Sequence, residues 1–381
     1  MSDVGLYVHV PFCSIKCGYC DFYSIVPVAS DIEPLVDALC RELAQCLKAG
    51  NIRVETIFVG GGTPTFLTGA LLEKLFAPLG ALARTHGVTE FTVEANPGSL
   101  NEDTLQILRA AEVDRISMGA QSFDVGELKT LERSHRPEQI ATGVERIRRA
   151  GFAHLNLDLI FGIPGQTTHS WRHSLNQAIT LEPDHLACYG LTYEPGTPMH
   201  ARRDQGSVEP VPEKQEARFY TTAVETLTRA GYVQYEISNF ARPGGLCRHN
   251  LRYWHNLPTL GVGPAAVSYL EGCRRRNVPD VASYVRAIQT GTSPTVEQEC
   301  LSSLQRAGET AMLMLRTVEG IDREHFREAT GFDPNALFAQ AIHDHASQGL
   351  LTADDRRIAL TDKGRLLADG ILSDFVVPAP H

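Results

Sequence analysis

The chain has 381 residues, of which 43% are hydrophobic, and its formal net charge at pH 7 is -10. This composition is typical of a globular protein with one large domain and a smaller one, and the negative charge makes nucleic acid a weak candidate partner. The N-terminus has no basic stretch before an apolar segment, and no run of about eighteen apolar residues occurs, so we expect a cytoplasmic protein with neither signal peptide nor membrane span.

Three cysteines follow the first expected strand, at 6–10. The loop VPFCSIKCGYCDFYS places Cys13, Cys17 and Cys20 in a C-x3-C-x2-C pattern. Three thiolates can hold three corners of a cubic iron-sulfur cluster and leave one iron open. Thiolates also bind zinc, so a structural Cys3His site that uses His9 or a distant histidine is the alternative. Disulfides are disfavoured, because the chain has nine cysteines, an odd number, and no secretory leader.

Short apolar strands then alternate with amphipathic helices. The six expected strands are 6–10, 56–59, 90–94, 115–119, 156–160 and 185–191. The first helix is expected to follow an N-cap at Ser30 and to stop at Gly50, and other helices are expected to end before Gly151 and Gly231. This alternation predicts a parallel sheet covered by helices, either open and doubly wound or curved into a barrel, and composition does not choose between them.

Polar residues and glycines gather where these strands end. The run GGGTPT, 60–65, follows the second strand, Glu94 ends the third, Gln121 follows the fourth, and Asp158 lies in the fifth. The carboxyl ends of successive parallel strands form one rim, where TIM-type barrels carry their active sites. Glycine also lets the backbone approach a ligand closely. The simpler alternatives are a tight turn for the glycines and ordinary salt-bridged or capping roles for the carboxylates.

The alternation fades from about residue 243 into a passage rich in Gly and Pro, followed by helices up to Phe375. We therefore divide the chain into 1–242, 243–300 and 301–381. The last part is expected to contain a helix, a short helix, a longer helix at 335–348, a small hairpin around Asp354 and Asp355, and a closing helix after Thr361. This is winged-helix order, but 335–348 has no Lys or Arg, so we expect a packing or partner-docking module instead of a DNA reader.

The whole chain resembles the HemN/HemW group of radical S-adenosylmethionine (SAM) proteins. The resemblance is carried by the cysteine pattern, by GGGTPT and by HNLRYW at 249–254, which matches an HNxxYW motif. It implies an α/β fold, a partial (β/α)6 TIM-type barrel with a C-terminal, mostly helical, winged-helix-like domain. It also implies a 4Fe-4S cluster on the three cysteines, with SAM chelating the fourth iron. The SAM contacts that it implies are Tyr7, Gly61, Gly62, Thr63, Glu94, Gln121, Arg133 and Asp158.

Two features separate the branches of this group. The coproporphyrinogen III oxidase branch has a further cysteine two residues beyond the third cluster thiol, where this chain has Phe22. The HNxxYW motif belongs to the haem-chaperone branch, and the neutral imidazole of His249 is a good axial ligand for haem iron. A hydrogen-bonded loop histidine is the alternative. Cys247 is a second soft ligand, a covalent attachment point or a small buried hydrophobe.

One segment departs from the group. Relatives commonly read GIGPGAHSY after the motif, whereas 261–269 reads GVGPAAVSY, so that Ala265 replaces a glycine and Val267 replaces a histidine. If that histidine helps to hold haem or substrate, this chain binds it differently.

The resemblance implies a cytoplasmic haem chaperone that binds a 4Fe-4S cluster, SAM and haem and passes haem to an acceptor protein. A reductant such as flavodoxin or ferredoxin is a further expected partner, and no catalytic residue is assigned. The alternative is a radical SAM enzyme that abstracts hydrogen from a porphyrinogen or another C-H bond. A zinc-stabilised binding module is a third, more distant interpretation.

Overall fold

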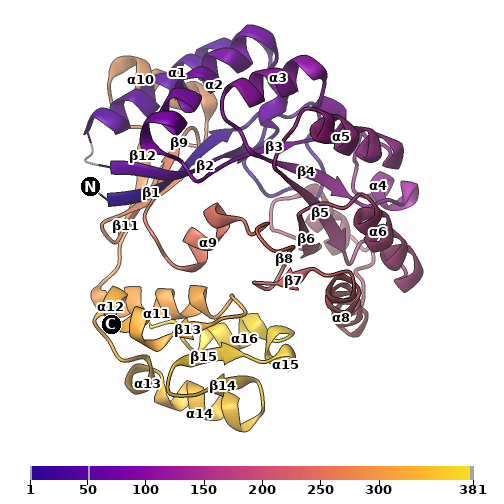
Figure 1. Ribbon diagram of the computed structural model, residues 1–381, viewed down its shortest axis with the longest axis vertical. Coiled ribbons are helices and arrows are strands. Elements are labelled where there is room, and N and C mark those ends of the chain that lie inside the picture. Colours follow the sequence, from indigo (N-terminus) through magenta and orange to yellow (C-terminus); the bar gives the residue numbers. More distant parts are fainter. Residues whose placement is uncertain (1, 50–51, 378–381) are drawn as a thin grey trace.

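The computed structural model describes residues 2–49 and 52–377, and its main body is a curved sheet with helices on its outer face (Figure 1). All six expected strands are confirmed, and each is parallel to the next. The elements of this body are β1 (Ser2–Val10), α1 (Ala29–Ala49), β2 (Ile52–Gly61), α2 (Gly69–His86), β3 (Glu90–Ala95), α3 (Glu102–Ala110), β4 (Arg115–Gln121), α4 (Val125–Thr130), α5 (Pro137–Arg149), β5 (His154–Phe161), α6 (Thr168–Thr180), β6 (His185–Gly190), α7 (Pro198–Asp204) and α8 (Glu213–Arg229).

The sheet extends beyond these six strands at both edges. On one side β9 (Thr259–Val262) pairs parallel with β1, and the antiparallel strands β10 (Val267–Leu270), β11 (Cys273–Asn277) and β12 (Thr295–Cys300) follow. On the other side β8 (Asn239–Ala241) and β7 (Val233–Gln234) lie antiparallel to β6. The strand order runs from β12 to β7 without closing among the described residues, so the sheet is the incomplete barrel that the resemblance implied.

The strands are buried on both faces, which explains their nearly continuous apolar sequences. In β1, Leu6 and Val8 on one face are at most 1% exposed, and His9 on the opposite face is 5% exposed. The outer helices cover the sheet with one apolar stripe each, as in α2, where Phe76 stacks on Phe91 of β3. One hydrophobic core therefore runs along the whole length of the barrel.

Helix limits agree with the expectation at the C-terminal ends but not at the first N-terminus. Helices α5 and α8 end two residues before Gly151 and Gly231, whose φ angles of 78° and 85° favour glycine. The N-cap predicted at Ser30 is wrong, since α1 already includes Ala29 and the Asp31 N–H donates to the Val28 carbonyl. Gly50 lies outside the described residues.

The expectation that helices follow the Gly- and Pro-rich passage directly is wrong for 243–300. This segment contains α9 (Arg248–Trp254) and α10 (Val281–Thr290), but also the four strands β9 to β12. The strands are short, and β12, with the sequence TVEQEC, is a mostly exposed edge strand without an apolar face. In Figure 1, α9 lies between the barrel and the C-terminal part of the chain.

The C-terminal part has the expected helix-hairpin-helix order around its own hydrophobic core. The helix predicted at 335–348 is two helices, because the chain bends at Phe338, whose side chain is buried against Phe326 and Phe375. The elements are α11 (Ser303–Met314), β13 (Ile321–Asp322), α12 (Arg323–Thr330), α13 (Pro334–Leu337), α14 (Ala339–Ser347), β14 (Leu351–Ala353), β15 (Arg357–Leu360), α15 (Asp362–Arg365) and α16 (Ala368–Ser373).

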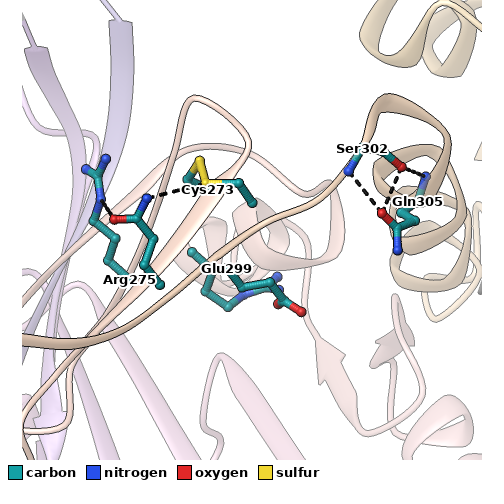
Figure 2. The surroundings of a disulfide bond; sticks show 8 residues. Cys273, Arg275, Glu299, Ser302 and Gln305 are labelled. Atoms are coloured by element: carbon teal, nitrogen blue, oxygen red, sulfur yellow. Dashed lines mark hydrogen bonds and ion pairs between the residues drawn. A yellow bond between two sulfur atoms is a disulfide. The ribbon is translucent and has the colours of Figure 1, made fainter. Parts of the chain in front are cut away.

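One disulfide, between Cys273 and Cys300, joins β11 to β12 (Figure 2). The two residues are register partners in the antiparallel pair, with Cα atoms 4.1 Å apart. Disulfides were rejected as an alternative for the three clustered cysteines, and this pair was not anticipated, because it depends on a hairpin that brings together two cysteines 27 residues apart in the chain. The thiols of Cys13, Cys17 and Cys20 are free.

No helix in 2–49 or 52–377 is both long enough and apolar enough to cross a bilayer.

Candidate functional site

The three clustered cysteines lie in the loop between β1 and α1, at the carboxyl end of the barrel. The Cys13 N–H donates to the Ile25 carbonyl at 3.0 Å, and the Cys20 N–H donates to the Cys17 carbonyl at 3.1 Å. Burial raises the pKa of the Cys13 and Cys20 thiols, and their neighbouring thiols add to this effect. The thiols therefore share one small, partly desolvated site.

This site differs from a single-ion site. Within the described ranges, no group of three or more His, Cys, Asp or Glu side chains is close enough to share one ion. A cubic cluster does not require this convergence, since each thiolate binds a different iron. His9, the local candidate for a zinc ligand, has both ring nitrogens occupied: Nε2 lies 2.8 Å from the Tyr23 carbonyl and Nδ1 lies 3.0 Å from the Tyr7 hydroxyl.

The glycine run at the end of β2 packs against the cysteine loop. The N–H groups of Gly62 and Thr63 donate to the carbonyls of Val10 and Phe12, both at 2.8 Å. A Cβ on Gly62 would lie 2.7 Å from the Phe12 carbonyl oxygen, and Gly61 has a φ of 106°. Glycine is therefore required at 62 for the close approach and is favoured at 61 for its φ, and the run packs directly on the cysteine loop in addition to forming a turn.

Two acidic side chains at the rim form no ion pair with a described residue, although the charge of Arg133 acts on Asp158 and partly offsets the rise in its pKa. The Glu94 carboxylate accepts the Gly61 N–H at 2.9 Å, and Asp158 accepts from the Asn156 amide at 2.7 Å. Burial, followed by the charge of Asp158, raises the pKa of Glu94 to about 7, and burial raises the pKa of Asp158 to about 6. A cationic ligand at this rim would favour the ionised forms and pair with them.

Arg133 connects the rim to the cluster loop. Its guanidinium donates to the Cys17 sulfur at 3.6 Å, to the Gly119 carbonyl at 3.0 Å and to the side chain of Asn96. Its Nε is buried and has no partner in the part of the chain that the structure describes. The Asn96 amide also donates to the Thr63 hydroxyl at 2.8 Å, and that hydroxyl lies 3.7 Å from the Cys13 sulfur.

Asn96 is a rim residue that sequence reasoning did not select. The available signal was its position, since it directly follows the third strand in the sequence TVEANP. Gln121, which was selected, ends β4 at a register shift and has a φ of 66°, a strained conformation for a residue other than glycine. Such strain is common where side chains are held for function.

His249 lies apart from this rim, toward the amino ends of the strands. Its Nδ1 is 2.9 Å from the Thr56 hydroxyl and its ring packs on Phe58. Along β2, Thr56 lies four positions before Gly60, which is roughly 13 Å at the rise of a strand. His249 is 1% exposed, its Nε2 is 3.3 Å from the Tyr253 hydroxyl, and burial lowers its pKa to about 3.

Buried charges hold α9 at that end of the barrel. The Glu90 carboxylate accepts the N–H groups of Arg248 and His249 at 2.8 and 3.0 Å, and lies 3.5 Å from the Arg115 guanidinium. Cys247 is 4% exposed and 3.4 Å from the same carboxylate, and burial raises the pKa of its thiol. Cys247 is therefore a protonated, buried thiol in this structure, and not a ready soft ligand.

A cavity of about 470 Å³ connects the two regions. Tyr7 and His9 of β1 line it, as do Phe22 of the cluster loop and Tyr253 of α9. The wall is completed by β10, β11 and Leu313 of α11. Tyr253 separates the His249 imidazole from this space, because its hydroxyl contacts the imidazole and its side chain lines the cavity.

The fold and the rim define a radical SAM protein. The family model described as Radical SAM superfamily matches residues 7–178, and that of the HemN C-terminal domain matches 301–367. Two full-length relatives make the assignment more specific. The chain is 35% identical to "Heme chaperone HemW" of Bacillus subtilis (strain 168), over 97% of this chain and 98% of the relative, and 33% identical to "Heme chaperone HemW" of Escherichia coli (strain K12), over 99% of each. The chain belongs to the HemW family.

A solved structure supports the same fold. Coproporphyrinogen III oxidase (HemN) from Escherichia coli, described as a radical SAM enzyme, matches with a TM-score of 0.84 and 25% identity, over 99% of this chain and 90% of that chain. The superfamily implies a 4Fe-4S cluster and SAM. The residues at the rim fit both groups, since they supply three free thiols and a glycine cradle that a Cβ would fill. Within the part of the chain that the structure describes, they also supply carboxyls without an ion pair and a buried guanidinium nitrogen without a partner.

Proposed function

We propose that this protein is a haem chaperone that binds a 4Fe-4S cluster, SAM and haem and passes haem to an acceptor protein in the cytoplasm. The similarity, nearly end to end, to relatives named heme chaperone carries this proposal. A reductant such as flavodoxin or ferredoxin would supply electrons to the cluster.

The rim residues have distinct roles in this proposal. Cys13, Cys17 and Cys20 hold the cluster, which, when bound, supplies an electron to the SAM sulfonium. Arg133 helps to position Cys17, because its guanidinium lies 3.6 Å from the sulfur. Glu94 pairs with the ammonium group of SAM, and the glycine run lets the SAM methionyl group approach the backbone.

The remaining contacts to SAM come from the next strands of the rim. Tyr7, Gln121 and Asp158 are proposed SAM-binding residues on β1, β4 and β5. Asn96 positions Thr63 and Arg133, since its amide group contacts both side chains.

We propose His249 as the haem iron ligand, with one structural requirement. Its lowered pKa keeps the imidazole neutral at physiological pH, the form that binds iron. The Thr56 hydroxyl fixes Nδ1, which leaves Nε2 for the metal. Tyr253 occupies Nε2 in this structure, so its side chain, which is 37% exposed, has to turn away for iron to bind.

Haem titration with and without the reconstituted cluster tests the proposal. Wild-type protein is expected to retain haem through gel filtration, and His249→Ala is expected to lose most of it. The matched control is His185→Ala. His185 is 2% exposed and also has both ring nitrogens hydrogen-bonded, to Asn156 and Tyr235, but it lies on β6. If the wild type and both variants retain haem equally, His249 is not the ligand.

A second candidate is a radical SAM enzyme acting on a porphyrinogen, which the overlap with coproporphyrinogen III oxidase favours. Phe22 stands where that branch has a further cysteine, and it is 69% exposed at the cavity mouth. Consumption of coproporphyrinogen III with release of carbon dioxide would replace the chaperone proposal with this one.

We keep the division into 1–242, 243–300 and 301–381 as a proposal. The separate hydrophobic core of the last part supports its boundary, whereas β9 to β12 tie 243–300 to the main sheet. Limited proteolysis that first cuts near residue 301 would agree with this division.

A further inference from the structure

We propose that haem lies in the 470 Å³ cavity beside β11, with its two carboxylates held by Arg274 and Arg276. This inference rests on the proposed function and names the place and the recognition chemistry. The ligand class is a flat tetrapyrrole that carries two neighbouring carboxylates.

The cavity suits a flat, mostly apolar ring in size and lining. Its volume lies within the range of about 300 to 1,000 Å³ that is usual for small-molecule sites. One wall carries Phe22 from the cluster loop, and another carries Leu313 from α11. Tyr253 and Tyr269 add aromatic faces, which pack well against a planar π system. The ring would therefore lie between the cysteine loop and the C-terminal part of the chain.

The two arginines lie on one face of β11. Alternate residues of a strand point to the same side, and both Arg274 and Arg276 line the cavity. Arg275 points to the other side, where it pairs with Gln298 at 3.3 Å (Figure 2). Residues two apart on a strand are about 6.5 to 7 Å apart, a spacing that suits two carboxylates on neighbouring ring positions. Guanidinium groups also bind carboxylates through two parallel hydrogen bonds.

The partners of these arginines on β12 are readily replaced. Arg274 lies 3.4 Å from Glu299 and Arg276 lies 3.5 Å from Glu297, and the glutamate side chains are 62% and 66% exposed. Long, exposed ion pairs of this kind contribute little, so a ligand carboxylate at closer range can displace them. Arg274 is held toward the cavity by a shorter contact with Glu309, at 2.8 Å, and by the Tyr269 ring.

The same cavity brings the ring near the proposed iron ligand. Tyr253 lines it and contacts the His249 Nε2 atom, so a turn of this one side chain connects the imidazole to the cavity. Val267, where relatives commonly have a histidine, also lines the cavity, and it offers iron no ligand atom. The contacts that Arg274 and Arg276 make with the two carboxylates do not depend on iron.

Equilibrium titrations with three probes test the assignment: haem, metal-free protoporphyrin IX and the dimethyl ester of haem. Arg276→Gln and Arg274→Gln are each expected to raise the Kd for haem about tenfold, because each removes one charge-assisted carboxylate contact. Protoporphyrin IX should show the same dependence. The ester should bind wild type weakly and show no response to the substitutions. Arg275→Gln is the matched control and should bind haem like the wild type.

The outcomes separate this inference from the function on which it rests. If wild type binds haem but Arg276→Gln and the ester bind equally well, the cavity assignment is wrong and the chaperone proposal stands. If wild type binds no haem at all, both are wrong. Among the described residues, the ion-pair partner of Arg276 is the exposed Glu297, so Arg276→Gln should fold. This holds even if Arg274→Gln, which leaves Glu309 without its ion pair, does not fold.

Discussion

The carboxylates at the two ends of the barrel differ in whether they have an ion-pair partner. Near the amino ends of the strands, carboxylates face buried arginines: the buried Glu90 faces Arg115, and Glu55, which is 34% exposed, pairs with Arg252. At the carboxyl rim, Glu94 and Asp158 have raised pKa values and no ion-pair partner among the described residues. The ion pairs near the amino ends fix α9 within the fold. The carboxyls at the rim can instead pair with a bound ligand.

The largest expected effect is the loss of iron when a cysteine at the carboxyl rim is replaced. Cys17→Ser is expected to reduce iron from about four atoms per chain to nearly none after anaerobic reconstitution, since the cluster needs all three thiolates. Iron and sulfide assays measure this. Cys46→Ser, a free cysteine on α1, is the control and should keep the full content. Full iron in Cys17→Ser would contradict the rim assignment.

The two ends should also have opposite pH dependence in the cofactor-free protein. The pKa of Glu94 is raised from 4.5 to about 7, so the folded state binds more protons and stability falls as pH rises through this window. The pKa of His249 is lowered from 6.5 to about 3, so stability is lost as pH falls from 6.5 toward 3.

Urea titrations across pH measure these two slopes. At about 1.36 kcal/mol for each unit of pKa shift, the free energy of unfolding of Glu94→Gln should rise relative to wild type by up to roughly 3 kcal/mol as pH increases from 4.5 to 7. That of His249→Gln should rise relative to wild type by up to roughly 5 kcal/mol as pH decreases from 6.5 to 3. If the free energy of unfolding changes with pH equally in wild type and both variants, Glu94 and His249 do not cause the opposite pH dependence.

The close packing of the glycine run on the cysteine loop predicts a smaller effect. Gly62→Ala would place a Cβ 2.7 Å from the Phe12 carbonyl, so it should cost about 2 to 3 kcal/mol of unfolding free energy and lower cluster yield. Gly98→Ala is the control, because its Cβ would meet only the Gln139 side chain, at 3.7 Å. Similar behaviour of both variants would contradict the packing argument.

The smallest expected effect concerns strain in the turn after β9. Ala265 has a φ of 60°, a conformation in which glycine is favoured, so Ala265→Gly should stabilise the protein by about 1 kcal/mol. Its neighbour Ala266 is 2% exposed and outside that region, so Ala266→Gly should destabilise it by a similar amount. Thermal unfolding of both variants tests the difference in sign.

The sequence predicted the local features of this fold well. Runs such as LYVHV and TIFV are apolar because parallel strands are buried on both faces, and this pattern is visible in the chain. The rim followed from residue position, since Glu94 lies near the end of one such run and Asp158 lies within another. Motif spacing then grouped the cysteines before any three-dimensional information was needed.

Features set by distant pairing were not predictable in this way. The pairing of β9 with β1 joins residues about 250 positions apart, and nothing local in TLGV indicates it. The HNLRYW motif predicted a haem ligand, but only the contacts of His249 with Thr56 and Tyr253 show that it is buried far from the cysteine loop. Two side-chain partners of Asn96, Thr63 and Arg133, likewise lie 33 and 37 positions away in the chain.

The bond between Cys273 and Cys300 has a consequence for the unfolded chain. It closes a loop of 27 residues, which in a chain-entropy description lowers the conformational entropy of the denatured ensemble by an amount equivalent to about 3 to 4 kcal/mol. In a reducing environment the bond opens and the unfolded chain regains this entropy. The persistence of the hairpin that carries Arg274 and Arg276 is thereby linked to the thiol-disulfide balance around the protein.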